Sequence, residues 1–378
     1  MGEISKVLVV GGGIGGLCTA IALRRRDVAV RVVEVNPNWD VYGVGIIQPG
    51  NALRALGELG LAEACLRDGF GFPGHQFHDR DGNPLGPPTD FPLPPGAPGP
   101  AMNGITRPRL HRILQDAVLA SGADVDTGLT ISSLVQGADG VDVAFSDGTS
   151  AAYDIVVGAD GINSLVRTMV FGPELRAEYI GQVCWRYNIP RPPDVNRLQM
   201  FVGSRGKAGF VPLADDLMYT LLIEKPPAGA PVKLPREGLA ATYRERLAEF
   251  GGPVAAVRDR YITDDDAVVY RPVEALIVPA PWHRGRVLLI GDAAHATSPH
   301  VGQGAAQAIE DAVVLGEEVE RGGAVPEVFE RFMGRRFDRC KLVVQGSLQI
   351  SRWEQDGSPD ADFDGVTARV GMAVAAPL

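Results

Sequence analysis

Runs of apolar, β-branched residues lie near both ends of the chain and predict buried strands. The run at 6–10 reads KVLVV and the run at 28–35 reads VAVRVVEV, and residues 14–26 between them have the small side chains of a closely packed helix. A strand, a helix and a second strand at this spacing form a βαβ unit. Two later runs, 154–159 and 286–292, predict further buried strands.

The next part of the chain predicts two helices and a proline-rich excursion. Leucines recur at helical spacing within 51–69, so we expect one helix there, and residues 107–122 predict a second. Asp81-Gly82 is typical of a hairpin turn. Prolines crowd residues 84–100, which excludes a helix or a central strand. This segment is either a surface excursion over a second domain or a disordered loop.

The middle of the chain is rich in predicted strands. A hairpin turns at Asp147-Gly148, and apolar and polar residues alternate in short stretches between about 180 and 270. Such alternation is typical of an antiparallel sheet with one open face. Helices are predicted for most of the remainder. Because α/β segments lie at both ends with strands between them, the pattern predicts an α/β fold with two domains interleaved in sequence.

Composition narrows the classes of partner. The net charge of −10 argues against nucleic acid and against an anionic membrane surface. The four cysteines are widely spaced and contain no CxxC pair, so neither a metal site nor a disulfide framework is predicted. No signal peptide and no apolar run of membrane-spanning length is recognised. We therefore expect a cytoplasmic protein.

The first glycine-rich turn predicts a dinucleotide site. Gly11, Gly13 and Gly16 follow a strand and open a helix, in the GxGxxG spacing. The first glycine permits the tight turn, the second lets a pyrophosphate approach the backbone, and the third lets helix and strand pack closely. Glu34 ends the next strand, where a carboxylate can bind the ribose hydroxyls of an adenosine.

A second glycine-rich turn near the C-terminus favours FAD over NAD. Asp292 closes a predicted strand, and Gly302 and Gly304 precede a helix. If this helix also directs its N-terminus at the ligand, the ligand must be long enough to reach two sites. FAD is long enough: a carboxylate suits its ribityl hydroxyls, and a helix N-terminus suits the ring edge that becomes negative on reduction.

These motifs resemble those of one enzyme family. The stretch GDAAHATSPHVGQGAAQAIED, residues 291–311, resembles the second FAD motif of single-component (class A) FAD-dependent aromatic hydroxylases and monooxygenases, of the p-hydroxybenzoate hydroxylase and salicylate hydroxylase type. DIVVGADGINSLVR, residues 154–167, resembles the middle motif of that family, and Arg107 resembles its arginine at a helix start beside FAD. The resemblance extends over roughly residues 5–345.

The resemblance implies a division of the chain and a reaction. It implies a Rossmann-like, glutathione-reductase-type FAD-binding domain interleaved with a β-sheet substrate domain, and C-terminal helices. The expected FAD-binding parts are 1–72, 101–179 and 271–345, the substrate parts 73–100 and 180–270, and the helical segment 346–378. NAD(P)H would bind transiently and reduce a non-covalently bound FAD. O₂ would then form a flavin C4a-hydroperoxide that hydroxylates a small aromatic or heteroaromatic substrate.

The resemblance also implies roles for individual residues. Arg186, Pro299 and Gly302 are predicted to act at the reacting centre, and Trp185 and Tyr187 flank Arg186 on the strand that enters the substrate domain. The predicted cofactor-binding residues are Gly11, Gly13, Ile14, Gly15, Gly16, Glu34, Gly45, Arg107, Ile131, Asp160, Gly161, Asp292, Gly302, Gln303 and Gly304. For Arg167, ligand contact and a structural ion pair are equally good interpretations, whereas His295 and His300 are expected to be structural.

Several alternatives stay open at this point. WRYNIP, residues 185–190, partly resembles a halogenase pattern, so a flavin-dependent halogenase is one alternative. An O₂-independent flavin reductase of the same superfamily and a non-catalytic FAD-binding protein are two others. We expect a monomer or homodimer whose partners are a small aromatic substrate, O₂ and NAD(P)H, with no nucleic acid and no membrane.

Overall fold

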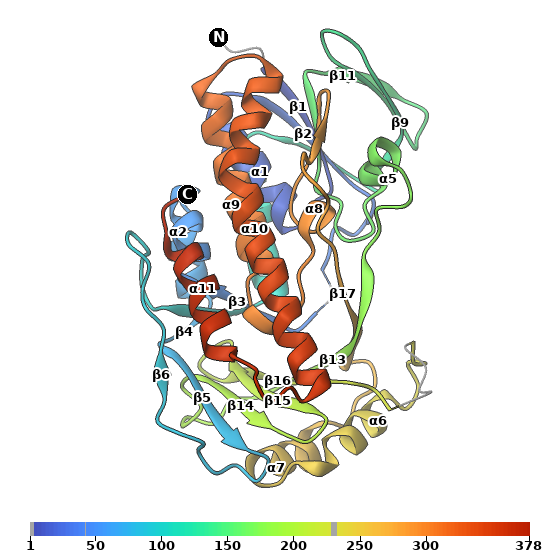
Figure 1. The fold of residues 1–378 in the computed structure, drawn as a ribbon. Coiled ribbons are helices and arrows are strands. Elements are labelled where there is room, and N and C mark those ends of the chain that lie inside the picture. Colours follow the sequence, from blue (N-terminus) through green and yellow to red (C-terminus); the bar gives the residue numbers. More distant parts are fainter. Residues whose placement is uncertain (1–3, 42, 228–232) are drawn as a thin grey trace.

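The predicted apolar runs form adjacent strands of one sheet in the computed structural model, which describes residues 4–41, 43–227 and 233–378 (Figure 1). The strand order is β18–β19–β12–β1–β2–β8, and the edge strand β18 alone pairs antiparallel in this sheet. The strands are β1 (Lys6–Val10), β2 (Ala29–Glu34), β8 (Asp124–Thr127), β12 (Ile155–Gly158), β18 (His283–Arg284) and β19 (Val287–Leu289). The four runs confirm the prediction of a parallel α/β core.

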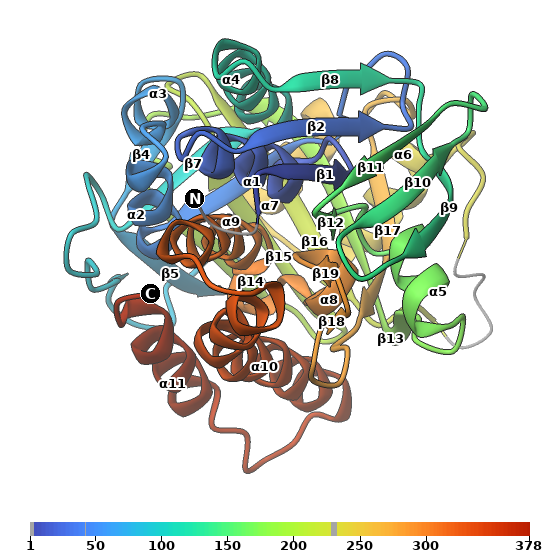
Figure 2. The same cartoon turned by 90° about the horizontal axis from the view of Figure 1, so that it is seen from above.

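Helices from both ends of the chain pack on this sheet. α1 (Ile14–Arg24) lies beside α9 (Gly304–Arg321), and α4 (Arg107–Ala120) lies on the other side of α1 (Figure 2). A three-stranded antiparallel sheet shares the same apolar core and contains the predicted hairpin at Asp147-Gly148. Its strands are β9 (Ile131–Gln136), β10 (Val141–Phe145) and β11 (Ser150–Tyr153).

The second large sheet is mainly antiparallel, as the alternation between 180 and 270 predicts. Its order is β17–β13–β16–β15–β14–β5–β6, and only β14 and β5 pair in parallel. The strands are β5 (Gly74–Asp79), β6 (Thr89–Asp90), β13 (Glu178–Pro190), β14 (Leu198–Val202), β15 (Gly206–Pro212), β16 (Leu217–Glu224) and β17 (Val269–Ala275). This pairing supports the proposed division into two interleaved domains, whose exact bounds stay a prediction.

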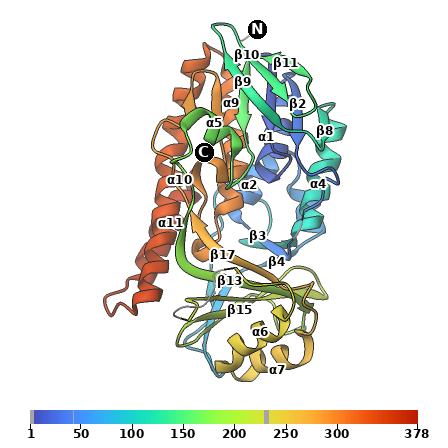
Figure 3. The same ribbon diagram turned by 90° about the vertical axis from the view of Figure 1, so that its right-hand side faces the viewer.

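The two faces of the seven-stranded sheet have different neighbours. Trp185 and Tyr187 of β13 pack in an apolar cluster with α6 (Leu239–Arg246), the short helix η1 (Leu247–Glu249) and α7 (Gly252–Tyr261), which cover the lower face (Figure 3). Cys184 belongs to a second cluster on the upper face. Because side chains alternate along a strand, Arg186 points to this upper face as well.

A small sheet joins the upper face to the parallel core. It has the order β3–β7–β4, with strands β3 (Gly45–Pro49), β4 (Phe70–Phe72) and β7 (Met102–Thr106). A Cβ atom on Gly45 would lie 2.3 Å from Leu213 Cδ2, and one on Gly104 would lie 1.9 Å from Pro212 O. The backbone of the small sheet therefore lies directly against strand β15 and the residue after it, and the site described below lies at this junction.

The prediction of one helix over 51–69 is wrong. The structure has α2 (Gly50–Glu58) and α3 (Ala62–Arg67), separated by Gly60, whose φ of +76° breaks the helix. The proline-rich segment 84–100 is an ordered surface excursion. Pro94 lies against Gly50, and Pro100 lies against Gly71. The predicted turn is confirmed: Asp79 N donates to Asn83 O across Asp81-Gly82.

The remaining helices connect the two sheets. Three short ones, α5 (Leu165–Phe171), α8 (Asp292–His295) and η2 (Pro299–Val301), follow strands of the parallel core. The long helix α10 (Val325–Asp356) runs from α9 to the seven-stranded sheet, and α11 (Phe363–Ala375) folds back along it (Figures 1 and 3). Among the described residues, no helix combines the length and apolar character that crossing a membrane requires.

Candidate functional site

The turn after β1 has the space that a bound pyrophosphate needs. Gly11 has φ of +110°, and a Cβ there would lie 2.4 Å from Ala159 O. A Cβ on Gly16 would lie 1.9 Å from Gly11 O, whereas one on Gly13 would meet nothing within 4 Å. The first and third glycines thus serve close packing. The second faces open space at the start of α1, where unpaired N–H groups attract an anion.

Glu34 fixes this turn from the neighbouring strand. Its carboxylate oxygens accept hydrogen bonds from Gly12 N at 2.7 Å and Asn36 N at 2.8 Å. Each oxygen keeps a second lone pair for a hydroxyl group. Leu129 N donates to the backbone carbonyl of Glu34, so the chain leading into Ile131 passes beside this residue. The predicted ribose acid and the predicted adenine-side backbone are therefore neighbours.

The second glycine turn lies next to the first. Gly302 has φ of +65° and no atom within 4 Å of an added Cβ, and Gly304 begins α9. Gln303 and Asn51 exchange two side-chain hydrogen bonds that hold the turn. A Cβ on Gly15 would lie 3.4 Å from Ala308 Cβ, so the first turn of α1 touches the second turn of α9. Both helices begin without an acidic side chain in the first turn.

Asp292 and Arg107 face each other beside these turns. Asp292 is exposed to solvent, yet burial raises the pKa of its carboxyl group, and His295 and Arg107 oppose that rise. A group that is both accessible and surrounded by protein lies in a concavity. Arg107 begins α4 and is half-buried; its pKa is lowered first by burial and then by the charge of Arg186.

Arg186 extends this concave region onto the seven-stranded sheet. The register pairs Arg186 with Leu221 on β16 and with Val269 on β17. Tyr219 and Arg271 lie on the same face, and both affect the pKa of Arg107. Burial raises the pKa of Tyr219 to about 12, so its hydroxyl is a neutral donor. We call Arg107, Arg186, Tyr219, Arg271 and Asp292 the arginine site.

The arginines of this site lack acidic partners at ion-pair distance. Within residues 4–41, 43–227 and 233–378, Arg107, Arg186 and Arg271 form no ion pair with a protein carboxylate and no side-chain hydrogen bond. Arg271 is exposed, but Arg107 and Arg186 are half-buried, and such cations are costly without a partner unless a ligand supplies one. Apolar side chains surround them; these are Val44, Phe72, Cys184, Met200, Val211, Leu213, Leu221, Ile223, Val269 and Val273.

Two other predicted site residues, Asp160 and Arg167, form hydrogen bonds that stabilise the local fold. Asp160 accepts hydrogen bonds from Ser164 Oγ, Leu165 N and Val166 N and so fixes the start of α5. Arg167 donates to three backbone carbonyls, those of Ile162, Leu175 and Ala293, which supports its structural interpretation. Beside them, Gly161 has no atom within 4 Å of an added Cβ.

Gly45 begins strand β3, and Pro299 begins the η2 turn. The need for glycine at 45 follows from the contact with Leu213 and Tyr219, because a Cβ would lie within 2.8 Å of both side chains. The η2 turn leads to Gly302. The direct contacts of Gly45, Ile14, Asp160 and Pro299 with a cofactor remain predictions.

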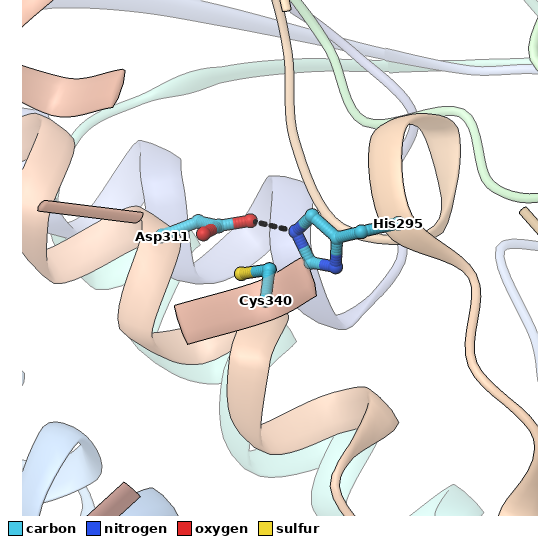
Figure 4. A group of neighbouring side chains, drawn as sticks. All are labelled: His295, Asp311 and Cys340. Atoms are coloured by element: carbon cyan, nitrogen blue, oxygen red, sulfur yellow. Dashed lines mark hydrogen bonds and ion pairs between the residues drawn. The ribbon is translucent and has the colours of Figure 1, made fainter. Parts of the chain in front are cut away.

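A cluster of His295, Asp311 and Cys340 lies behind the second glycine turn (Figure 4). Its three potential metal-binding atoms lie within 4.8 Å of one another. Asp311 already accepts bonds from His295 Nε2 at 2.6 Å, Gly291 N at 2.9 Å and Arg336 Nε at 2.7 Å. Arg336 Nη2 also lies 3.3 Å from Cys340 Sγ. A guanidinium in this position repels a metal cation, so the cluster is a structural ion-pair network.

Sequence reasoning missed several residues of the site. Tyr219 and Arg271 belong to no motif, and only the alternation along their strands could have placed them on the face of Arg186. Trp39 was also missed: its Nε1 donates to Gly12 O at 3.1 Å, beside His111 Nε2 at 3.0 Å from the same oxygen. These two side chains support the first glycine turn from outside.

The geometry fits FAD. Two open glycine positions, two adjacent helix N-termini and the carboxylates of Glu34 and Asp292 supply the groups that bind the pyrophosphate and the hydroxyls of a dinucleotide. Arg107 interacts electrostatically with both Asp292 and Arg186, which links the arginine site to the second glycine turn.

Comparisons with known proteins agree. A family model described as "FAD binding domain" matches residues 5–347. The chain is 35% identical to the 2-heptyl-3-hydroxy-4(1H)-quinolone synthase of Pseudomonas aeruginosa, covering 93% of this chain and 90% of that one. It is 30% identical to the FAD-dependent urate hydroxylase of Klebsiella oxytoca, covering 90% and 88%.

A solved structure gives the same result. HpxO of Klebsiella pneumoniae complexed with FAD and uric acid has a TM-score of 0.82 and 25% identity, covering 98% of this chain and 92% of that one. The fold predicted from the sequence is thereby confirmed, whereas the contacts of the glycine turns with the cofactor stay a prediction. The chain belongs to the single-component FAD-dependent hydroxylases and monooxygenases, and FAD is its cofactor.

Proposed function

We propose that this protein uses NAD(P)H and O₂ to hydroxylate a small aromatic or heteroaromatic substrate that carries, or can acquire, a negative charge. The observation that supports the proposal is the arginine site, in which Arg186 and Arg107 are half-buried and have no protein carboxylate at ion-pair distance. An anionic substrate would supply the missing charge. The relatives named for quinolone and urate chemistry act on heteroaromatic rings, which is in keeping with this class.

FAD supplies the redox chemistry and the activation of O₂ in this family. The residues of this chain bind, orient and enclose. Arg186 would anchor the anionic group by paired hydrogen bonds, and the apolar side chains beside it would hold the ring and exclude water. Tyr219, kept neutral by burial, would donate a hydrogen bond to a ring oxygen. Arg107, between Asp292 and Arg186, would separate the cofactor from the substrate anchor.

The remaining proposed roles belong to the carboxylates of Asp292 and Glu34 and to the turn from Pro299 to Gly302. Asp292 would accept hydrogen bonds from cofactor hydroxyl groups, and Glu34 would do the same at the other end. The turn from Pro299 to Gly302 would form the wall beside the reacting ring, and its helix N-terminus would stabilise negative charge there. The one other GxGxxG spacing in the sequence, Gly69-Gly71-Gly74, lies at strands β4 and β5 and opens no helix, in keeping with transient NAD(P)H binding.

The decisive experiment is a substrate screen of the purified FAD-loaded protein. A panel of hydroxybenzoates, hydroxyquinolones and purines would be tested for O₂ uptake and NAD(P)H oxidation, with matched neutral amides and esters as controls. We expect an anionic member to stimulate both and to yield a product heavier by one oxygen atom. Chlorination with a flavin reductase and chloride, or turnover without O₂, would instead support the halogenase or the reductase alternative.

A further inference from the structure

A buried polar chain links the second glycine turn to the seven-stranded sheet. His300, in the η2 turn, lies between Ser298 and Glu354: Ser298 Oγ is 2.9 Å from His300 Nδ1, and Glu354 Oε2 is 3.2 Å from His300 Nε2. Glu354 Oε1 accepts a very short hydrogen bond from Lys207 Nζ. The chain thus runs from the turn, through α10, to strand β15.

Glu354 joins four separate elements. Its own helix, α10, ends two residues later at Asp356. Gln182 Nε2 of β13 lies 3.4 Å from Glu354 Oε2, and Ser351 Oγ of α10 donates to Gln182 Oε1 at 2.6 Å. Lys207 contributes a contact from β15, and His300 contributes one from the η2 turn. The contacts therefore converge on one carboxylate from two strands of the seven-stranded sheet and from the η2 turn.

The position of Glu354 is unfavourable for its own helix. Carbonyl groups and the negative end of the helix dipole face the last turn, where an acidic side chain costs free energy and a basic one stabilises. The pKa of Glu354 is nevertheless lowered to about 2, because His300 and Lys207 outweigh the burial that would raise it. The contacts with His300 and Lys207, rather than stabilisation of the helix, explain why a glutamate occupies this position.

The carboxylate of Glu354 defines the tautomer of His300. A bare Nε2 would repel this carboxylate, 3.2 Å away, so Nε2 carries the proton and Nδ1 accepts a hydrogen bond from Ser298 Oγ at 2.9 Å. Ser347 Oγ is then the donor in its contacts with Ser298 Oγ at 2.7 Å and with Ser298 O at 2.8 Å. Burial lowers the pKa of His300, in keeping with a neutral ring. The Nε2–H is not yet well aligned with Glu354, so a small ring rotation would complete the bond.

We propose that Glu354 is a positioning residue for the flavin-binding turn: through His300 it sets the place of Ser298 to Gly302 relative to the sheet that carries Arg186. Gln182 and Arg186 lie four residues apart on the same face of β13, and Lys207 acts electrostatically on Cys184 between them. A change at the substrate face can therefore reach the turn beside the flavin along a continuous set of contacts. This inference needs only FAD binding; the substrate readout below rests on the proposed function.

The test is the isosteric substitution Glu354→Gln. A glutamine has one acceptor oxygen, so its NH₂ group must face either Lys207, as two donors, or His300, which would reverse the histidine tautomer. We expect E354Q to bind FAD with a dissociation constant within about threefold of the wild type. The visible absorption spectrum and the midpoint potential of the bound FAD should both shift. Lys207→Met, which frees the carboxylate from the sheet, should shift them in a smaller degree.

Arg335→Gln is the matched control. Arg335 pairs with Glu317 and Glu318 between α9 and α10, away from the turn, so its loss removes inter-helix ion pairs alone. We expect this variant to change stability without changing the flavin spectrum or potential. Identical spectra and potentials in E354Q and the wild type, or equal shifts in R335Q, would overturn the proposal. If E354Q does not fold, K207M and Ser298→Ala carry the same test.

A second readout uses turnover. With an active compound from the substrate screen, E354Q should release at least about threefold more hydrogen peroxide per NAD(P)H, because a displaced turn admits water to the reacting centre. Unchanged coupling together with a shifted spectrum would limit the role of Glu354 to FAD and overturn its link to the substrate face. If none of the screened compounds stimulates NAD(P)H oxidation, the proposed function is contradicted, but the spectral test of Glu354 stays valid.

Discussion

Two groups of buried charges in this protein differ in one respect that separates architecture from function. Behind the second glycine turn, His295, Glu310, Asp311 and Arg336 form a network in which each charge has an opposite partner within 2.7 Å. In the arginine site, Arg107 and Arg186 have no such partner. A charge that the fold already neutralises stabilises the fold, whereas a buried charge that lacks a partner is available to a ligand.

The largest expected effect is on the satisfied network. Arg336→Met should destabilise the protein by about 3–5 kcal/mol, because it removes the cation that two buried carboxylates share and leaves Asp311 with His295 and Glu310 with Arg339 alone. Urea unfolding of the FAD-free protein measures this change. Arg335→Met, at a partly exposed pair on the same helix, should cost less than about 1 kcal/mol. Equal costs for the two variants would remove the distinction between the networks.

Replacement of Arg186 should have the opposite pattern, with a small effect on stability and a large one on activity. Arg186→Met should leave the free energy of unfolding within about 1 kcal/mol of the wild type, since no protein carboxylate loses a partner. It should lower kcat/KM for the anionic substrate by about 2–3 kcal/mol, or roughly 30- to 150-fold. Arg186→Lys keeps the charge without the planar fork and should recover part of the loss. A strongly destabilised R186M would show that Arg186 is structural.

The network behind the turn also predicts the pH dependence of stability. Although burial alone would raise it, the charges of His295 and Arg336 lower the pKa of Asp311 from 3.8 to about 2. A lowered carboxyl pKa stabilises the fold above about pH 4, and the contribution is lost as the pH falls toward 2. This contribution of Asp311 to the free energy of unfolding is about 2 kcal/mol.

The histidine of the pair acts in the other direction. Burial alone would lower the pKa of His295, but its acidic neighbours Cys340 and Asp311 raise it well above 6.5. A raised histidine pKa contributes stability below about pH 6.5 that is lost as the pH rises through the raised value. Unfolding of the wild type and of Asp311→Asn from pH 2 to 9 measures both limbs, and the variant should lack them. Parallel curves for the two proteins would contradict this assignment.

The sequence predicted the glycine turns well and the arginine site poorly, for a physical reason. Each glycine turn is local: a strand, a spacing and a helix suffice to define it. Arg271 and Tyr219 meet Arg186 only through strand pairing, and the pairing of β13 with β17 shifts register between Tyr179 and Val183, around Gly181 with φ of +92°. An irregularity of this kind reverses which residues share a face, and no local pattern announces it.

The same reason explains the helix and the carboxylate that the sequence did not reveal. The leucine spacing around Gly60 suits one continuous helix, and only the packing of α2 and α3 on different neighbours makes use of the positive φ of that glycine. Glu354 resembles any acidic residue of a long helix until its contacts with β13, β15 and the η2 turn are known. Local chemistry was predictable, and contacts between distant segments were not.

The smallest predicted effect concerns FAD binding, and two glycines of the first turn allow ligand binding and stability to be compared within one motif. Gly13→Ala adds a methyl group to open space at an ordinary φ of −84°, so the FAD-free protein should unfold as the wild type does. The methyl group should instead occupy the path of the pyrophosphate and weaken FAD binding by about tenfold, or 1.4 kcal/mol. Gly16→Ala, whose Cβ would lie 1.9 Å from Gly11 O, should destabilise the fold itself. Fluorescence titration with FAD and urea unfolding of both variants separate the two effects. A G13A protein that binds FAD as tightly as the wild type would show that the open position is not the phosphate site, because a ligand that touched the backbone there could not tolerate the added carbon.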